Sequence, residues 1–224
     1  MKRYNHLLFD LDGTLADPSE GITKSIAYAL DHLGITSPSL TALQSWIGPP
    51  IKQSLMDLYN LDEVAADRGV AKYRERFTDI GIYENKLFEG IPELLEAAKA
   101  QDYNIYLATS KPTVFAERIL RYFKIDPYFN FVGGSGLDDS RPTKAHVIEH
   151  VMDQTDISAD AALMIGDRKY DIIGGQTFQM DTVGVLYGFG DRTELEKAGA
   201  TYIIDNIHEL GDFLTKRKRG YHIQ

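Results

Sequence analysis

Short apolar runs alternate with stretches of helical periodicity along most of the chain. Apolar runs that end in polar residues or glycine predict strands. We expect four of them at 4–10, 104–109, 161–165 and 182–186, and two shorter ones at 129–132 and 202–204. Apolar positions spaced three and four residues apart predict the helices between them, over 91–101, 113–123, 144–154, 171–176 and 207–216. This alternation predicts an α/β fold with a doubly wound, mostly parallel sheet.

One region interrupts the alternation. Residues 16–83 show helical periodicity and no convincing strand, with helices predicted over 51–59 and 63–77. The first of its apolar stripes consists of Ile22, Ile26, Leu30 and Leu33. We interpret 16–83 as a small all-helical cap domain inserted after the first strand, and 1–15 with 84–224 as the α/β core.

The polar residues that end the predicted strands indicate a site. Ligands of open α/β sheets bind beyond the carboxyl ends of the strands, which lie at one edge of the sheet. The first strand ends in Asp10-Leu11-Asp12-Gly13-Thr14. Side chains two residues apart point the same way along a strand, so Asp10 and Asp12 form a carboxylate pair that a divalent cation would stabilise. An ordinary Asp-Gly turn is the alternative interpretation.

A second acidic segment follows a later strand. Gly166-Asp167-Arg168-Lys169-Tyr170-Asp171 adds two acids at the same edge of the sheet. Four carboxylates in one place would destabilise the fold without a metal ion, and oxygen ligands favour Mg²⁺. We therefore predict that Asp10, Asp12, Asp167 and Asp171 bind metal, and that one carboxylate of the first pair attacks an electrophile while the other transfers protons. A turn residue at 167 and a helix cap at 171 are the structural alternatives.

Two further segments carry groups suited to a phosphoryl group. Thr109-Ser110-Lys111 ends a strand, and its hydroxyls can donate hydrogen bonds to phosphoryl oxygens, although a helix cap before Pro112 explains Thr109 equally well. Lys144, after Ser140-Arg141-Pro142-Thr143, begins a helix, where a cation is unfavourable to the helix dipole. A lysine and a metal ion together can neutralise a phosphoryl transition state. An exposed surface lysine is the alternative.

Composition narrows the classes of partner. The formal net charge is -9, which disfavours wholesale nucleic-acid binding but leaves room for a small phosphorylated metabolite held by local cations. The chain has no cysteine, which excludes disulfides and thiolate metal sites. No apolar stretch approaches the ~20 residues that a membrane span needs, and none is typical of a signal peptide. We expect a cytoplasmic monomer or homodimer without membrane association.

Four motifs occur in a fixed order: DxDGT, a hydroxyl at a strand end, a lysine, and GDxxxD, with the helical insertion after the first. This ordered set covers nearly the whole chain and resembles the haloacid dehalogenase-like (HAD) hydrolase superfamily. The insertion resembles the helical cap of the phosphoglycolate phosphatase and β-phosphoglucomutase branch. The stretches LATSKP, GDRKYDI and GVLYGFG are similar to members called phosphoglycolate phosphatase-like or 5'-nucleotidase-like.

The resemblance implies a role for each acid. Asp10 matches the nucleophile that forms an aspartyl-phosphate. Asp12 matches the general acid/base, which also offers its backbone carbonyl to Mg²⁺. Asp167 matches a direct metal ligand, and Asp171 matches the second acid of its motif, either a ligand or a neighbour of one.

The resemblance also implies the phosphate-binding residues, with two departures. Gly13, Thr109 and Ser110 would contact the phosphate, and Lys144 would stabilise both nucleophile and phosphate. Ser110 stands where many relatives have Asn. Many relatives carry the lysine in a KPxP sequence, and here Arg141-Pro142 occupies that place. Arginine mimics a compact ammonium poorly beside a carboxylate, so Lys144 is the first candidate and Arg141 the second.

These features predict a Mg²⁺-dependent phosphatase, a phosphoric monoester hydrolase acting on phosphoglycolate or a nucleoside 5'-monophosphate. The cap would set specificity, with Lys52, just beyond Gly48-Pro49-Pro50, as the candidate contact; a solvated lysine after an inter-helix turn is the alternative. A phosphomutase of the β-phosphoglucomutase type would pass phosphate to a sugar hydroxyl instead of water. A dehalogenase would leave the second aspartate and GDxxxD unexplained, and a non-catalytic binding module would leave the clustered acids unexplained.

Overall fold

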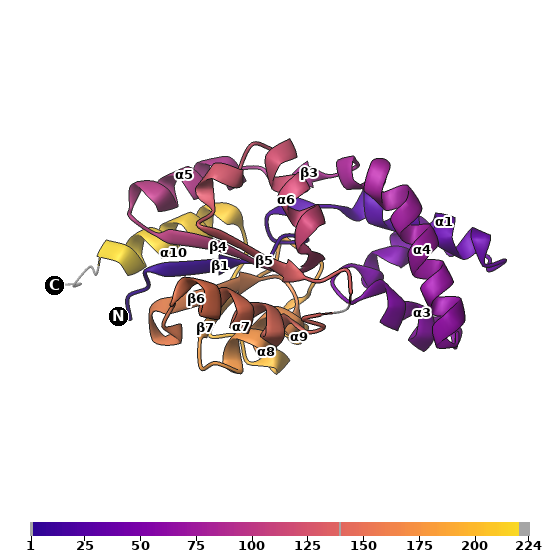
Figure 1. Ribbon diagram of the computed structural model, residues 1–224. Coiled ribbons are helices and arrows are strands. Elements are labelled where there is room, and N and C mark those ends of the chain that lie inside the picture. Colours follow the sequence, from indigo (N-terminus) through magenta and orange to yellow (C-terminus); the bar gives the residue numbers. More distant parts are fainter. Residues whose placement is uncertain (1, 139, 220–224) are drawn as a thin grey trace. The chain divides into compact units, whose positions relative to one another are not determined.

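The computed structural model describes residues 2–138 and 140–219, and it divides into two compact units (Figure 1). The core unit comprises Met1–Leu15 and Leu87–Gln224, and the helical unit comprises Ala16–Lys86. Met1, Asp139 and residues 220–224, which belong to the predicted core, lie outside the described residues. Each unit is described by itself below.

The core unit is built on a parallel six-stranded sheet with helices on both faces, which confirms the predicted fold class. The strand order is β5-β4-β1-β6-β7-β8, and all neighbouring strands run parallel. The strands are β1 (His6–Phe9), β4 (Asn104–Pro112), β5 (Phe131–Ser135), β6 (Ala162–Gly166), β7 (Asp181–Val185) and β8 (Tyr202–Ile204). The chain winds outward from β1 through β4 and β5, and then through β6 to β8 on the other side. The winding direction therefore changes at β1, where open α/β sheets bind their ligands.

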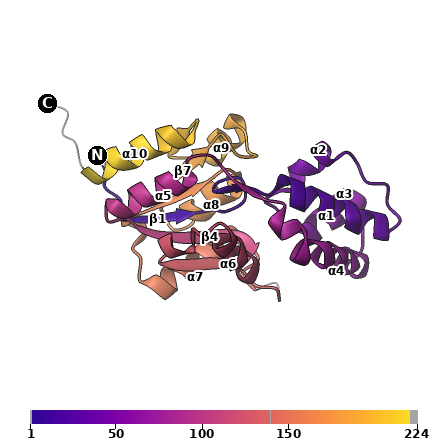
Figure 2. The same cartoon turned by 90° about the horizontal axis from the view of Figure 1, so that it is seen from above.

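The helices of the core unit cover both faces of this sheet. They are α5 (Ile91–Ala100), α6 (Thr113–Tyr122), α7 (Lys144–Thr155), α8 (Lys169–Gln176), α9 (Arg192–Ala198) and α10 (Ile207–Arg219), with 3-10 turns η3 (Asp126–Tyr128) and η4 (Ala159–Ala161). Helices α5, α6 and α10 lie on one face, and α7, α8 and α9 lie on the other (Figure 1). Helix α10 packs beside α5, as Figure 2 shows from above.

Helix α8 begins two residues earlier than the periodicity predicts. The expected start was Asp171, whereas the structure begins α8 at Lys169. The reason is a local hydrogen bond: the backbone N–H of Arg168 donates to Asp171 Oδ2 over 3.0 Å. A side chain in the first turn that accepts from the N-cap backbone satisfies a donor that the helix itself leaves unpaired. Asp171 therefore lies inside the first turn.

A buried apolar layer between the sheet and α7 fixes this helix in place. Its members include Leu8 from β1, Tyr106 and Ala108 from β4, Met164 from β6, and Val147, Ile148 and Val151 from α7. Full burial of an aliphatic side chain of this size stabilises the fold by about 1.5–3 kcal/mol. The helical residues are spaced three and four apart, so they form one face of α7. Lys144 begins the same face, one turn before Val147.

The helical unit consists of α1 (Ser19–His32), α2 (Leu40–Leu43), α3 (Ile51–Tyr59) and α4 (Glu63–Asp79), with 3-10 turns η1 (Gln44–Trp46) and η2 (Gly81–Tyr83). Of the predicted stripe, Ile22, Ile26 and Leu30 are buried. Two short strands, β2 (Ala16–Asp17) and β3 (Lys86–Leu87), pair with one another. The sequence predicted no strand within 16–83, so β2 is a correction: two residues are too few to show alternation.

No helix within 2–138 and 140–219 combines the length and the apolar character that crossing a membrane requires.

Candidate active site

Parallel register brings the ends of the central strands level with one another. Phe9 on β1 is opposite Leu107 on β4 and Ile165 on β6. Asp10 follows Phe9 directly, and its backbone N–H donates to the carbonyl of Ile165 over 2.9 Å. Thr109 and Asp167 lie two residues beyond Leu107 and Ile165. The sequence therefore places polar side chains from three adjacent strands at one edge of the sheet.

Three carboxylates meet at this edge. One oxygen from each of Asp10, Asp167 and Asp171 lies within 4.8 Å of the other two, and all three residues are buried. Asp10 comes from the end of β1, Asp167 from the turn after β6, and Asp171 from the first turn of α8. The structure thus gathers three of the four acids that the sequence singles out as metal ligands.

Lys144 lies against two of these acids. Its Nζ is 2.8 Å from Asp10 Oδ1 and 2.8 Å from Asp171 Oδ1, and it donates to the carbonyl of Ala108 over 2.9 Å. Burial alone would lower the pKa of Lys144, but the charges of Asp10 and Asp171 outweigh burial and hold this pKa above its usual range. The side chain therefore stays a buried ammonium. This placement differs from the exposed lysine that was the alternative.

Asp12 has a lysine of its own. Lys111 Nζ lies 2.7 Å from Asp12 Oδ2, and the side chains are only 5% and 13% exposed. The sequence analysis gave Lys111 no role. A signal was present, because side chains alternate along a strand: Thr109 and Lys111 are buried, whereas Ser110 between them is half-buried. Alternation from Thr109 would have placed Lys111 on the same side.

Asp167 is held by the chain segments around it. Its Oδ2 accepts from the backbone N–H of Phe189 over 2.8 Å, and Thr14 Oγ1 lies 3.4 Å from Oδ1 as a donor. Gly13 has a φ of +87°, and a Cβ there would lie 2.1 Å from Asp167 Oδ2, so the turn requires glycine. The hydroxyl of Tyr187 donates to the carbonyl of Thr14 over 3.1 Å. Sequence reasoning missed the segment after β7, because a backbone donor has no side-chain signature.

The cluster carries more negative than positive charge. Burial, followed by the charges of Asp171 and Asp10, raises the pKa of Asp167 well above its usual range. Burial also raises the pKa of Asp12, and raises the pKa of Asp171 to about 6 despite Lys144. In the described part of the chain, these four carboxylates contact two ammonium groups, so the fully ionised cluster has two uncompensated negative charges.

A divalent cation fits this arrangement. All the donors are oxygens, which suits a hard cation, and a double positive charge would balance the two uncompensated negative charges. The residues present therefore fit a divalent metal ion held by the Asp10, Asp167 and Asp171 carboxylates.

The predicted phosphate-binding residues lie in different surroundings. Thr109 is buried beside the acids, and its Oγ1 accepts from the backbone N–H of Lys111 over 3.2 Å. Ser110 offers its backbone carbonyl to Ser135 Oγ over 2.9 Å. Arg141 donates from Nε to the carbonyl of Gly134 over 2.8 Å. Of the two candidates for the motif cation, Lys144 contacts the acids, whereas Arg141 contacts a backbone carbonyl.

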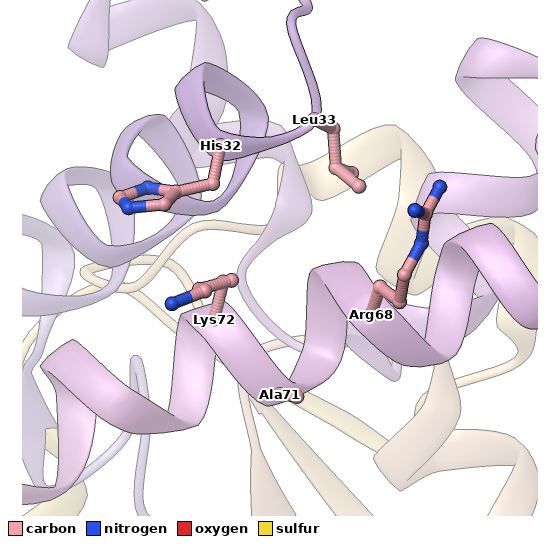
Figure 3. A pocket seen from close by; sticks show the side chains of 5 residues that line it. All are labelled: His32, Leu33, Arg68, Ala71 and Lys72. Atoms are coloured by element: carbon pink, nitrogen blue, oxygen red, sulfur yellow. The ribbon is translucent and has the colours of Figure 1, made fainter.

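The helical unit holds Lys52 and a pocket of its own. Lys52, on α3, lies 2.8 Å from Asp67 Oδ1 on α4, so the structure gives it an ion-pair partner. A cavity of about 300 Å³ is lined by His32, Leu33, Arg68, Ala71 and Lys72, which come from the end of α1 and from α4 (Figure 3). None of the predicted site residues is among these five lining residues.

Comparison with known proteins identifies the family. A haloacid dehalogenase-like hydrolase family model matches residues 7–185, which include all the acids of the cluster. The chain belongs to the haloacid dehalogenase-like hydrolases. This result confirms the resemblance that the ordered motifs indicate, and it confirms that the chain is an enzyme of hydrolase type.

Several relatives of this hydrolase match over most of its length. A 5'-nucleotidase from Pseudomonas aeruginosa is 46% identical over 95% of this chain and 96% of its own. The tyrosine-protein kinase PtkA from Mycobacterium tuberculosis is 34% identical over 91% of this chain and 71% of its own. A crystal structure of a predicted phosphatase from Clostridium acetobutylicum has a TM-score of 0.93 at 44% identity, and covers 96% of this chain and 99% of its own.

Proposed function

We propose that the protein is a Mg²⁺-dependent phosphatase that hydrolyses a small phosphate monoester through an aspartyl-phosphate on Asp10. The observation that carries this proposal is the position of Asp10. Its carboxylate lies at a strand end against Lys144 and within 4.8 Å of oxygens from Asp167 and Asp171. A carboxylate so placed combines a nucleophile with an adjacent ammonium and with oxygen ligands for a divalent cation, which suits phosphoryl transfer.

The surrounding residues have distinct parts in this reaction. Asp10 attacks phosphorus, and Asp12 gives a proton to the leaving oxygen and later takes one from water. Lys144 balances charge on Asp10 and on the transferred group, and Gly13, Thr109 and Ser110 bind the phosphate. Mg²⁺, held by Asp10, Asp167, Asp171 and the Asp12 carbonyl, would neutralise phosphoryl charge when bound.

The substrate class rests on similarity and on the helical unit. A 5'-nucleotidase is 46% identical over nearly the whole chain, which supports a nucleoside 5'-monophosphate as substrate. Phosphoglycolate is the second candidate, from the family branch that the motifs resemble. We assign residues 16–83 as a cap that selects the leaving group, and Lys52 as its candidate contact. Because Lys52 pairs with Asp67, binding through Lys52 would require this ion pair to open or to include the ligand.

A phosphate-release screen tests the proposal. The purified protein is incubated with Mg²⁺ and with nucleoside 5'-monophosphates, phosphoglycolate or sugar phosphates, and inorganic phosphate is measured. We expect release from at least one ester, its loss in EDTA, and its loss in Asp10→Asn. Activity that survives Asp10→Asn would contradict the nucleophile assignment.

The same screen separates hydrolysis from transfer to another acceptor. A phosphomutase of the β-phosphoglucomutase type would convert a sugar phosphate to its isomer without releasing phosphate. Chromatography of the sugar phosphates detects such isomerisation. Isomerisation without phosphate release would replace the phosphatase proposal by the mutase proposal. Phosphate release with water as the only acceptor would exclude a pure transferase.

A further inference from the structure

Lys111 is a buried cation for which the proposed reaction has not yet given a task. Its Nζ lies 2.7 Å from Asp12 Oδ2, and its side chain is 5% exposed. Lysine is almost never buried unless it is paired, because removing an ammonium from water is costly. The ion pair with Asp12 therefore accounts for the burial of Lys111, and its role in the reaction is the question.

The backbone around Lys111 is built to turn its side chain toward Asp12. Its N–H donates to Thr109 Oγ1 over 3.2 Å, and the register between β4 and β5 shifts between Thr109 and Pro112. The opposite strand approaches closely at this point: a Cβ on Gly134 would lie 2.4 Å from the carbonyl oxygen of Lys111. This close contact and the hydrogen bond to Thr109 hold the Lys111 backbone at the end of β4, the point from which its side chain reaches Asp12.

The two buried lysines of the site serve different acids. Lys144 contacts Asp10 and Asp171, whereas Lys111 contacts Asp12. Of the two Asp12 oxygens, Oδ2 is the one that lies 2.7 Å from Lys111 Nζ. Oδ1 is buried, and it has no hydrogen-bond partner within the part of the chain that the structure describes. One oxygen of the carboxylate is thus anchored, and the other is left for a partner from outside the protein.

We propose that Lys111 is a positioning residue that anchors Asp12 through Oδ2, so that Oδ1 faces the leaving oxygen and then the attacking water. This inference rests on the proposed function. In the first step an Asp10 oxygen bonds to phosphorus, the ester O–P bond breaks, and the Asp12 proton passes to the leaving oxygen. In the second step water attacks phosphorus, its proton passes to Asp12, and the Asp10 O–P bond breaks. Lys111 itself transfers no proton in either step.

The dependence on the leaving group distinguishes this role from a general structural one. An alkoxide needs a proton as it leaves, whereas p-nitrophenolate is weakly basic and leaves without one. Misplacing Asp12 should therefore slow the first step with an alkyl ester much more than with p-nitrophenyl phosphate. General damage to the site would slow the first step with both esters alike.

The experiment compares wild type and Lys111→Met by rapid quench, with Mg²⁺, on p-nitrophenyl phosphate and on the alkyl ester that turns over fastest in the screen. We expect the first-turnover rate of Lys111→Met to fall about 100-fold with the alkyl ester and less than about threefold with p-nitrophenyl phosphate. Steady-state turnover of p-nitrophenyl phosphate should fall, which gives a burst of nitrophenolate, because the second step also needs Asp12. The ester concentration that gives half of the maximal first-turnover rate should stay within about threefold for both esters, because it reports binding.

A control variant, a conservative variant and a replacement for a variant that does not fold complete the experiment. Lys2→Met is the matched control, because it removes another core-unit lysine whose Nζ lies 2.8 Å from a carboxylate, that of Asp181 at the start of β7. It should leave both rates unchanged. Lys111→Arg keeps the charge and should restore part of the alkyl-ester rate. If Lys111→Met does not fold, Lys111→Gln enters the same assay.

Three results would overturn the inference. Equal losses with both esters in Lys111→Met would make Lys111 structural. Unchanged rates with both esters would mean that Asp12 needs no anchor. Either result with an active wild type would leave the proposed function standing. A wild type that releases phosphate from no ester would instead overturn the proposed function, and this inference with it.

Discussion

Both units of the molecule contain a network of charged side chains, and the two networks differ in balance. In the helical unit, Arg76 forms two hydrogen bonds with Glu84, of 2.8 and 3.1 Å, and Lys24 lies 3.1 Å from the same carboxylate. The hydrogen bonds from Arg76 are the main cause that lowers the pKa of Glu84 below its usual range. Lys24 Nζ also lies 2.6 Å from Glu20 Oε1, so two cations balance two carboxylates in this network.

The acidic cluster of the core unit has the opposite balance. Its carboxylates are more numerous than the ammonium groups that contact them, and burial raises the pKa of Asp167 and Asp171 above the usual range. Such an excess is destabilising unless something outside the protein compensates it. The comparison teaches that a balanced network ties helices together, whereas an unbalanced one indicates a ligand. The predictions below test this contrast.

The largest difference is expected in catalysis. Asp10→Asn should lower kcat/KM for the best ester on the order of 10⁴-fold or more, because it removes the nucleophile. Glu84→Gln, the matched amide substitution in the balanced network, should change kcat/KM by less than about threefold if that network is structural. Phosphate release with Mg²⁺ measures both. A comparable loss in Glu84→Gln would remove the distinction between the two networks.

The next largest difference is expected between the free energies of unfolding of two variants in EDTA, one from each network. Lys144→Met leaves Asp10 and Asp171 without their shared cation, and loss of one partner from a buried ion pair costs about 3–5 kcal/mol. Arg76→Met breaks a more exposed network and should cost about 1–2 kcal/mol. Urea unfolding followed by circular dichroism gives both free energies of unfolding. Equal costs would show that the buried cluster is no more demanding than the network of the helical unit.

Metal binding should stabilise only a protein whose acidic cluster is intact. With Mg²⁺ at about 100 times its Kd, wild type should gain about 2.7 kcal/mol relative to EDTA, because the ion binds only the folded state. Asp167→Asn should lose most of this gain, and Glu84→Gln should keep it. Thermal unfolding in parallel series of Mg²⁺ concentrations measures the gains. An equal gain in Asp167→Asn would place the metal elsewhere.

The smallest expected effect is the pH dependence of the metal-free protein. Burial raises the pKa of Asp171 to about 6, above the value in an unfolded chain. A raised carboxyl pKa means that the folded state binds the proton more tightly, so stability rises as the pH falls through about 6. Between about pH 7.5 and pH 5 the Asp171 contribution should be about 1 kcal/mol. Urea unfolding in EDTA measures it as the difference between wild type and Asp171→Asn.

If the free energy of unfolding of wild type falls relative to that of Asp171→Asn as the pH is lowered from about 7.5 to about 5, the raised pKa of Asp171 is contradicted. Glu84→Gln should follow the wild-type curve, because the pKa of Glu84 is lowered and its contribution changes only at more acidic pH.

Much of the site could be predicted because it depends on local patterns. The apolar run before Asp10 and the one before Asp167 both end at the same edge of a parallel sheet, and this edge follows from strand–helix alternation. Lys144 was indicated by its position at a helix start, where a cation is unfavourable to the helix dipole, and by the family resemblance. The structure places it on the face of α7 that Val147 and Ile148 bury. The inference about the sheet edge needs only the periods of the two regular structures.

The rest depends on contacts between segments that are distant in the sequence. The pair of Lys111 with Asp12 joins two strand ends, and the Phe189 N–H reaches Asp167 from the segment after β7. Propensity and periodicity describe a residue's own segment, so they cannot specify such partners. Helix α8 illustrates the same limit on a small scale, because its start was moved by one side-chain hydrogen bond to Asp171.

The central claim is that Asp10 carries the phosphoryl group between substrate and water. The most direct measurement is an acid quench of wild type during turnover with Mg²⁺, followed by peptide mass spectrometry. We predict a phosphoryl group on Asp10 that is labile to hydroxylamine and that is missing in Asp10→Asn. Phosphate release without a phosphoryl group on Asp10, or with one on another residue, would contradict the claim.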